Sequence, residues 1–132
     1  MAEGGCRCGT VRYEVSGEAA HHALCHCRDC QMSTGAPMVA WMAFKADAFR
    51  VTKGEASCYN GAGASKRYFC STCGTPVYFI NEDMLPGIVD VQSVTLDEPD
   101  ASAPSAHIQV AERRKWMEGV EALPAFERWP GA

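Results

Sequence analysis

Three cysteines lie within six residues of one another, Cys25, Cys27 and Cys30, in the spacing C-x-C-x-x-C. Thiolates bind zinc, and a zinc with only three protein ligands keeps one position open for water or a substrate, as in catalytic sites. A site with three thiolates is electron-rich, so it favours binding and activating a substrate thiol over making hydroxide from water. The cluster therefore indicates attack of a thiolate on a small electrophile such as an aldehyde, or the reverse reaction.

Two cysteine pairs, one before and one after the central three cysteines, share a second sequence pattern. Cys6 and Cys8 are followed by Gly-Thr and a strand-like segment, and so are Cys70 and Cys73. Glycine directly after the second cysteine suits a tight turn with positive φ. Closing the long loop between the pairs costs about 4 kcal/mol plus a constant, whereas a structural zinc contributes roughly 10–16 kcal/mol. We therefore predict a structural zinc on these four cysteines and a second, catalytic zinc on the other three.

Alternative groupings remain open at this point. One pair could join two cysteines of the central cluster, or the central cluster could be a second structural site with a fourth protein ligand. The candidates for that fourth ligand are Cys58, His22, His26 and His107. If residues 23–27 are extended, Cys25 and Cys27 point to one side and His26 to the other, which predicts a buried or neighbouring histidine instead of a ligand. Cys58 has no partner spacing and is predicted to be a buried thiol.

Composition limits the class of protein. The chain has 132 residues, is 47% hydrophobic and carries a net charge of −4. This length predicts one domain over residues 1–132, and the lack of a basic run argues against nucleic-acid binding. The sequence shows neither a signal peptide nor an apolar segment long enough for a membrane. We therefore expect a cytoplasmic protein with reduced or metal-bound thiols and no membrane partner.

Strands dominate the elements that must position the cysteines. Alternating or short apolar runs predict strands or extended segments over residues 11–15, 23–27, 37–44, 49–52, 66–69, 76–80, 88–94 and 107–110. A turn is expected from Cys27 to Gly35. The best helix candidate covers residues 112–121 and is kept short by Gly119 and Pro124. The predicted fold is mainly β with zinc-ribbon-like knuckles and little helix.

The order of these motifs resembles a known family. The motifs are C-x-C-G at 6–9, C-H-C-x-x-C at 25–30, G-A-P at 35–37, C-x-x-C-G-T-P at 70–76, and H-I-x-V at 107–110 with Trp116 and L-P-x-F at 123–126. They resemble the glutathione-dependent formaldehyde-activating enzyme family, which also includes centromere protein V-like proteins. The resemblance implies an Mss-four-like β fold, with Cys6, Cys8, Cys70 and Cys73 on a structural zinc and Cys25, Cys27 and Cys30 on a catalytic one. It also implies joining of glutathione and formaldehyde into S-(hydroxymethyl)glutathione, and the reverse lyase reaction.

Three functional hypotheses follow. The first is a zinc-dependent carbon-sulfur lyase or synthase for adducts of a small thiol, possibly glutathione, with an aldehyde such as formaldehyde. The second is a non-catalytic zinc-binding interaction module, and the third is a redox sensor that uses Cys27 and Cys30 as a C-x-x-C pair. Asp29 is the one acid close to the central cluster in sequence, and the cations that could bind substrate carboxylates are Arg28, Lys66 and Arg67.

Overall fold

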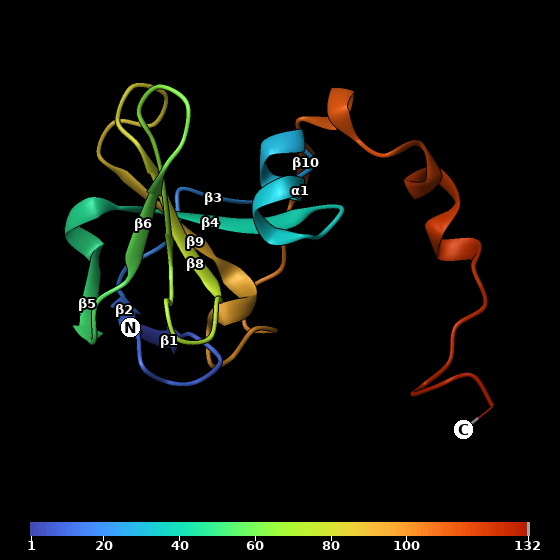
Figure 1. Cartoon of the computed structure of the whole chain (residues 1–132), viewed down its shortest axis with the longest axis horizontal. Helices are drawn as coiled ribbons and strands as arrows, with labels where there is room; N and C mark the ends of the chain where they lie inside the picture. The colour runs from blue at the N-terminus through green and yellow to red at the C-terminus, as the bar shows by residue number, and fades with distance from the viewer. Residues whose placement is uncertain (132) are drawn as a thin grey trace.

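The computed structural model describes residues 1–131, which form a mainly β structure (Figure 1). The strands in this range are β1 (Ala2–Gly5), β2 (Arg12–Val15), β3 (His21–Cys25), β4 (Val39–Lys45), β5 (Phe49–Lys53), β6 (Ser57–Asn60), β7 (Ser65–Phe69), β8 (Pro76–Asn81), β9 (Ile88–Gln92) and β10 (Ala106–Ile108). The α-helix α1 (Arg28–Thr34) and the 3-10 segments η1 (Ala46–Ala48), η2 (Ser93–Thr95), η3 (Val110–Glu112) and η4 (Lys115–Ala122) complete the regular structure of these residues. The prediction of a mainly β fold with little helix is confirmed.

The strands form two sheets. β1, β2 and β5 make a three-stranded sheet, and the other seven strands follow the order β10-β3-β4-β9-β8-β7-β6. Neighbouring strands of the larger sheet are antiparallel, except that β10 runs parallel to β3 and places Ile108 opposite Cys25. The first cysteine of the central cluster therefore lies at the end of a strand next to the sheet edge.

Strand β4 separates two hydrophobic cores, because successive side chains of a strand point to opposite faces. On one face Phe44 packs in the cluster that contains Tyr13 of the small sheet. On the other face Trp41 packs with Cys25 and Cys30. Burying a large apolar side chain contributes about 1.5–3 kcal/mol. The central cysteines are thus built into one of the two cores.

The structure corrects the prediction for residues 23–35. The extended segment ends at Cys25, and the expected turn is the helix α1. Cys27 is its N-cap: the backbone N–H of Cys30 donates to the Cys27 sulfur at 3.2 Å. Gly35 ends the helix with φ 69°, a left-handed conformation that glycine adopts without steric cost. A thiol in the capping role and a length of seven residues hid this helix from the sequence pattern.

Two strands have no clear pattern in the sequence. β1 is glycine-rich, and a Cβ atom on Gly4 would lie 2.5 Å from the hydroxyl oxygen of Tyr13, so this position requires glycine because the buried tyrosine occupies the space. β6 is the edge strand of the larger sheet and carries Cys58. Cys58 is exposed there, so the prediction of a buried thiol is wrong.

The segment after β10 differs most from expectation. Residues 112–121 do not form an α-helix; η3 and η4 are short 3-10 segments instead. Residues 113–131, which we call the arm, leave the sheets beside α1 and continue away from them toward the C-terminus (Figure 1). None of the helices in residues 1–131 has the length and apolar character needed to cross a membrane.

Candidate metal sites

The first candidate metal site joins the two cysteine pairs. The sulfur atoms of Cys6, Cys8, Cys70 and Cys73 all lie within 4.8 Å of one another. The Cys8 sulfur is 3.7 Å from that of Cys6 and 3.8 Å from that of Cys70. Tetrahedral zinc with Zn–S bonds of about 2.3 Å has S···S edges of about 3.8 Å. The spacing of the four sulfurs therefore fits a tetrahedral zinc.

The repeated Cys-Gly-Thr sequence explains this arrangement. Gly9 and Gly74 both have φ 81°, and each donates its N–H to the carbonyl of the first cysteine of its pair, at 3.1 Å to Cys6 and 2.8 Å to Cys70. Hydrogen bonds from the side chain and backbone of Thr75 lower the pKa of Cys73 to about 5. The two knuckles thus have the same turn, and the Thr75 hydrogen bonds favour the thiolate form of Cys73, the form in which cysteine binds a metal.

The second candidate site is the central cluster. The sulfurs of Cys25, Cys27 and Cys30 lie within 4.8 Å of one another, and those of Cys25 and Cys30 are 3.7 Å apart. The three residues occupy the end of β3, the N-cap of α1 and its first turn. Hydrogen bonds from Cys25 and Cys27 and the charge of Arg67 outweigh burial and lower the pKa of Cys30 to about 5. The pKa of Cys25 is raised, first by its hydrogen bond with Cys30. The three sulfurs thus concentrate negative charge on Cys30.

The structure places the candidate fourth ligands elsewhere. In residues 1–131 the central cluster consists of three metal-binding side chains and has no histidine within its 4.8 Å limit. His26 is fully buried, and its Nε2 lies 2.8 Å from Nδ1 of His107. His22 contacts Ser93 and Ser102, and Cys58 is exposed on β6. His26 is buried and lies outside the cluster, as the sequence predicted, and the cluster contains three cysteines.

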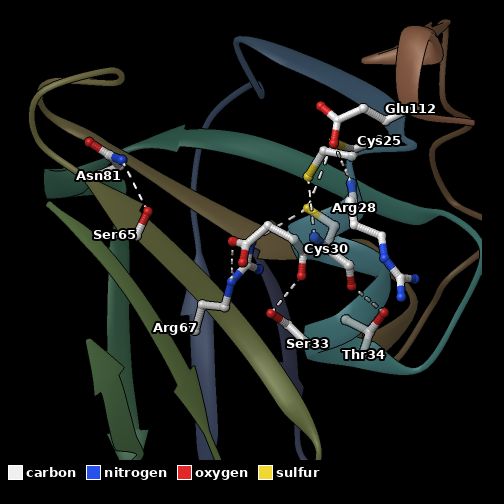
Figure 2. Close-up of polar contacts among 11 residues, drawn as sticks. Cys25, Arg28, Cys30, Ser33, Thr34, Ser65, Arg67, Asn81 and Glu112 are labelled. Carbon is white, nitrogen blue, oxygen red and sulfur yellow. Dashed lines mark hydrogen bonds and ion pairs between the residues drawn. The ribbon is translucent and has the colours of Figure 1, made fainter. Parts of the chain in front are cut away.

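An arginine from a distant strand completes the surroundings of the cluster. Nη2 of Arg67 on β7 lies 2.6 Å from Oδ2 of Asp29 and 3.6 Å from the Cys30 sulfur. Figure 2 shows Arg67 reaching from its strand toward Cys30, with Cys25 beyond it. Its guanidinium stacks 4.8 Å from the centre of the Phe79 ring, and its side chain is only 13% exposed. The sequence suggested this arginine for a substrate carboxylate, but the structure pairs it with Asp29 and the cluster.

A groove of about 570 Å³ opens beside the central cluster. Its lining includes Asp29 of α1 and Gly74 of the second knuckle. Aromatic side chains make up much of the rest of the lining, namely Trp41, Tyr59, Tyr68, Phe69 and Tyr78. Small-molecule sites have volumes of about 300–1,000 Å³ and mostly apolar walls. The size and lining of this groove suit a small molecule. Asp29 and Arg67 connect the groove to the central cluster, whereas none of the three cysteines lines it.

Comparisons with known proteins agree with this geometry. The model of the glutathione-dependent formaldehyde-activating enzyme (GFA) family matches residues 1–112. The chain belongs to this family. An uncharacterized lyase from Schizosaccharomyces pombe is similar to this GFA-family chain, with 26% identity over 112 residues, 74% of this chain and 81% of the relative. A crystal structure of a Rhodobacter sphaeroides protein matches with a TM-score of 0.62 and 24% identity, over 80% of this chain and 98% of that chain.

These findings confirm the resemblance seen in the cysteine motifs. The family model covers most of the chain, and the relative from Schizosaccharomyces pombe is named as a lyase. The Rhodobacter sphaeroides protein supports the fold. The two cysteine clusters are those that the spacing predicted, and both could hold a metal ion. The sequence missed the contact between Arg67 and Cys30 because it has no local signal: β7 reaches the cluster only through the pairing of the sheet.

Proposed function

We propose that the protein is a zinc-dependent carbon-sulfur lyase or synthase that acts on adducts of a small, glutathione-like thiol with an aldehyde such as formaldehyde. The observation that carries the proposal is the central cluster, in which three sulfurs converge without a fourth protein ligand in residues 1–131, beside an aromatic groove. Family membership supports the choice of a glutathione-like thiol and formaldehyde. The proposal assigns Cys25, Cys27 and Cys30 to the catalytic zinc.

The other four cysteines have a different role in the proposal. Cys6, Cys8, Cys70 and Cys73 would hold a structural zinc, which makes two zinc ions per chain. The S···S distances of 3.7 and 3.8 Å support this assignment, because they equal the edge of a zinc-thiolate tetrahedron of about 3.8 Å. The site is closed by four thiolates, so it has no position for a substrate.

The chain's own residues prepare the open site for a thiol. When bound to the central cluster, zinc would supply a positive centre that lowers the pKa of a substrate thiol. Arg67 holds positive charge 3.6 Å from the Cys30 sulfur, so it offsets part of the negative charge of three thiolates. Asp29 fixes the guanidinium in this position. The half-buried Cys27 lies between two buried cysteines, so the cluster faces solvent mainly through this residue.

The groove would hold the body of the thiol. Arg28 follows Cys27 in the sequence, and Lys66 lies on β7; both are exposed cations. They remain candidates to bind substrate carboxylates. In the synthase direction the thiolate sulfur attacks the aldehyde carbon, a C–S bond forms and the carbonyl oxygen takes a proton to become a hydroxyl. In the lyase direction the hydroxyl loses its proton, the C–S bond breaks and the electron pair returns to sulfur.

The remaining sequence predictions belong to the same proposal. A single domain over residues 1–132 would contain both metal sites, since the four-cysteine site joins Cys6 and Cys8 to Cys70 and Cys73, which lie on either side of the central cluster in the sequence. A cytoplasmic location fits eight free cysteines, because the cytosol keeps thiols reduced. A small thiol is the partner that the open cluster requires.

Two measurements test the proposal. Nuclear magnetic resonance would follow exchange between glutathione and S-(hydroxymethyl)glutathione with zinc-loaded protein. We expect faster exchange with the natural protein and with Cys58→Ser, and no acceleration with Cys27→Ser. Metal analysis should give two zinc ions per chain, falling to one in a folded Cys27→Ser protein.

The outcomes separate the proposed enzyme from an interaction module. The absence of both acceleration and glutathione binding would refute the enzyme. Zinc absorption spectroscopy that finds a protein nitrogen as the fourth ligand of the central zinc would instead support the non-catalytic module. An S₃ site with one light exogenous ligand supports the open site.

A further inference from the structure

The arm exposes large apolar side chains that the rest of the chain does not cover. Trp116 is 61% exposed and Trp129 is 78% exposed, and Leu123 and Phe126 are also exposed. The arm contains η4, a 3-10 helix of eight residues. Such helices longer than three or four residues are uncommon, and a short helix without tertiary packing is marginal in water. The arm therefore requires a packing partner for its conformation.

An unassigned groove on the body has suitable chemistry. Its volume is about 970 Å³, and none of the cysteines lines it. Its apolar floor consists of Val15, Met42 and Phe44, which are at most 9% exposed, and the half-buried Leu96. Four exposed acidic residues also line it, Glu3, Glu18, Asp97 and Glu98. Asp97 already pairs with Arg12, so Glu3, Glu18 and Glu98 form the acidic rim. We call it the acid-rimmed groove.

The arm and the acid-rimmed groove lie at opposite ends of two parallel strands. His21 and His22, at the start of β3, line the groove, as does Ser105 just before β10. The arm leaves after the far end of β10, where Glu112 accepts a hydrogen bond from the backbone N–H of Arg28 at 2.9 Å. From there it continues away from the sheets (Figure 1). The arm of one chain is thus directed outward, where a second molecule can bind it.

Next to its two tryptophans, the arm carries positive charges that complement the acidic rim of the groove. Lys115 precedes Trp116, and Arg128 precedes Trp129. Each indole therefore brings a cation that can pair with the acidic rim while the ring occupies the apolar part of the groove. The glutamates of the arm, Glu118, Glu121 and Glu127, lie between these two positions or directly before Arg128.

The area of the arm matches what a stable dimer needs. An aromatic side chain buries about 150–250 Å², so Trp116, Phe126 and Trp129 together offer about 450–750 Å². Two exchanged arms would therefore bury about 900–1,500 Å² of their own surface. Stable interfaces start at about 1,200 Å². Reciprocal exchange between identical chains is also a common route to symmetric dimers.

We propose that the arm of one chain docks in the acid-rimmed groove of a second copy, so that two chains form a symmetric dimer by arm exchange. The tryptophans are the anchors, and their neighbouring cations pair with Glu18 and Glu98. The interface is separate from the two cysteine clusters, so it does not depend on the catalytic activity proposed above.

Sedimentation velocity of the full, zinc-loaded chain over a range of concentrations tests the proposal. We expect a dimer that weakens as salt rises. Trp116→Ala combined with Trp129→Ala should weaken dimerisation roughly tenfold or more, as loss of aromatic anchors does. The matched control is Tyr59→Ala with Met84→Ala, two residues that are 63% and 71% exposed outside the arm and the acid-rimmed groove.

Reversing charges on the arm and on the rim tests whether the acid-rimmed groove is the docking site. Glu18→Lys with Glu98→Lys should weaken the dimer, and so should Lys115→Glu with Arg128→Glu. Combining the four changes should restore it, whereas Glu55→Lys with Asp83→Lys, at exposed sites elsewhere, should have no effect. A natural protein that stays monomeric at every concentration overturns the proposal. A dimer that survives both pairs of charge changes also overturns it.

Discussion

Asp90 is a buried carboxyl whose cost to the fold can be measured. It lies on β9 between Ala43 of β4 and Phe79 of β8 in the sheet register. Only 6% of the residue is exposed, and its Oδ1 has no hydrogen-bond partner within residues 1–131. Burial raises the pKa of Asp90 from its ordinary value of 3.8 to about 6, with a smaller opposing effect from His21 and a smaller reinforcing one from Cys30.

The sign of the effect follows from linkage between folding and protonation. Because the folded pKa of Asp90 is the higher one, the unfolded chain releases the proton more readily, and stability falls as pH rises from about 4 through about 6. With pKa values of 3.8 and about 6, the cost to folding is about 1.5 kcal/mol at pH 5 and about 3 kcal/mol at pH 7, where it levels off. Asp90→Asn removes this cost because the amide does not ionise.

Urea unfolding of the metal-loaded natural protein and Asp90→Asn between pH 5 and pH 8 gives the test. The difference in unfolding free energy should shift in favour of Asp90→Asn by about 1 kcal/mol or more from pH 5 to pH 7 and then stay constant. Any cost of burying the new amide is independent of pH, so the slope is the diagnostic quantity. Asp83→Asn, at an exposed site, should show no such slope. A pH-independent difference for Asp90→Asn would refute the reasoning.

Three further changes have expected outcomes. Cys73→Ser should abolish soluble, folded protein in an expression and melting assay, because a structural zinc contributes roughly 10–16 kcal/mol and a domain is stable by only about 5–15 kcal/mol. Arg67→Ala should raise the pKa of Cys30, because the guanidinium lowers it; thiolate absorbance against pH, for protein that keeps the four-cysteine zinc but has lost the central one, measures the change, and an unaltered titration would contradict it. Gly35→Ala should cost about 1–2 kcal/mol in urea unfolding, because φ is 69° there, whereas Gly119→Ala, at a position without positive φ or a close neighbour, should have little effect.

The sequence predicted the metal chemistry better than the local structure around it. The Cys-Gly-Thr repeat favoured the pairing of Cys6 and Cys8 with Cys70 and Cys73 over the other groupings, and the structure brings these four sulfurs together. The central three cysteines were also found by spacing. Their backbone was not: the sequence pattern suggested a strand through Cys27, because a cysteine N-cap lacks the usual signature of serine, threonine, asparagine or aspartate.

Contacts between distant strands could not be predicted from local patterns. The position of Arg67 beside Cys30 depends on the sheet order, in which β7 pairs with β8 and β8 with β9. The aromatic groove likewise combines Trp41 of β4 with Tyr59 of β6 and Tyr78 of β8. The predicted helix at 112–121 failed for another reason. Its apolar side chains are exposed, so packing within the described chain does not stabilise an α-helix there.

The lining of the aromatic groove includes one residue next to each of the two cysteine clusters. Asp29 belongs to the helix that carries Cys30, and Gly74 belongs to the knuckle that carries Cys73. If two zinc ions bind as proposed, loss of the structural ion would disrupt the fold and, with it, the part of the substrate groove that Gly74 lines. The zinc supply in the cell would then determine how many molecules are folded and active. Zinc limitation would lower the number of active molecules more than the catalytic rate of each one.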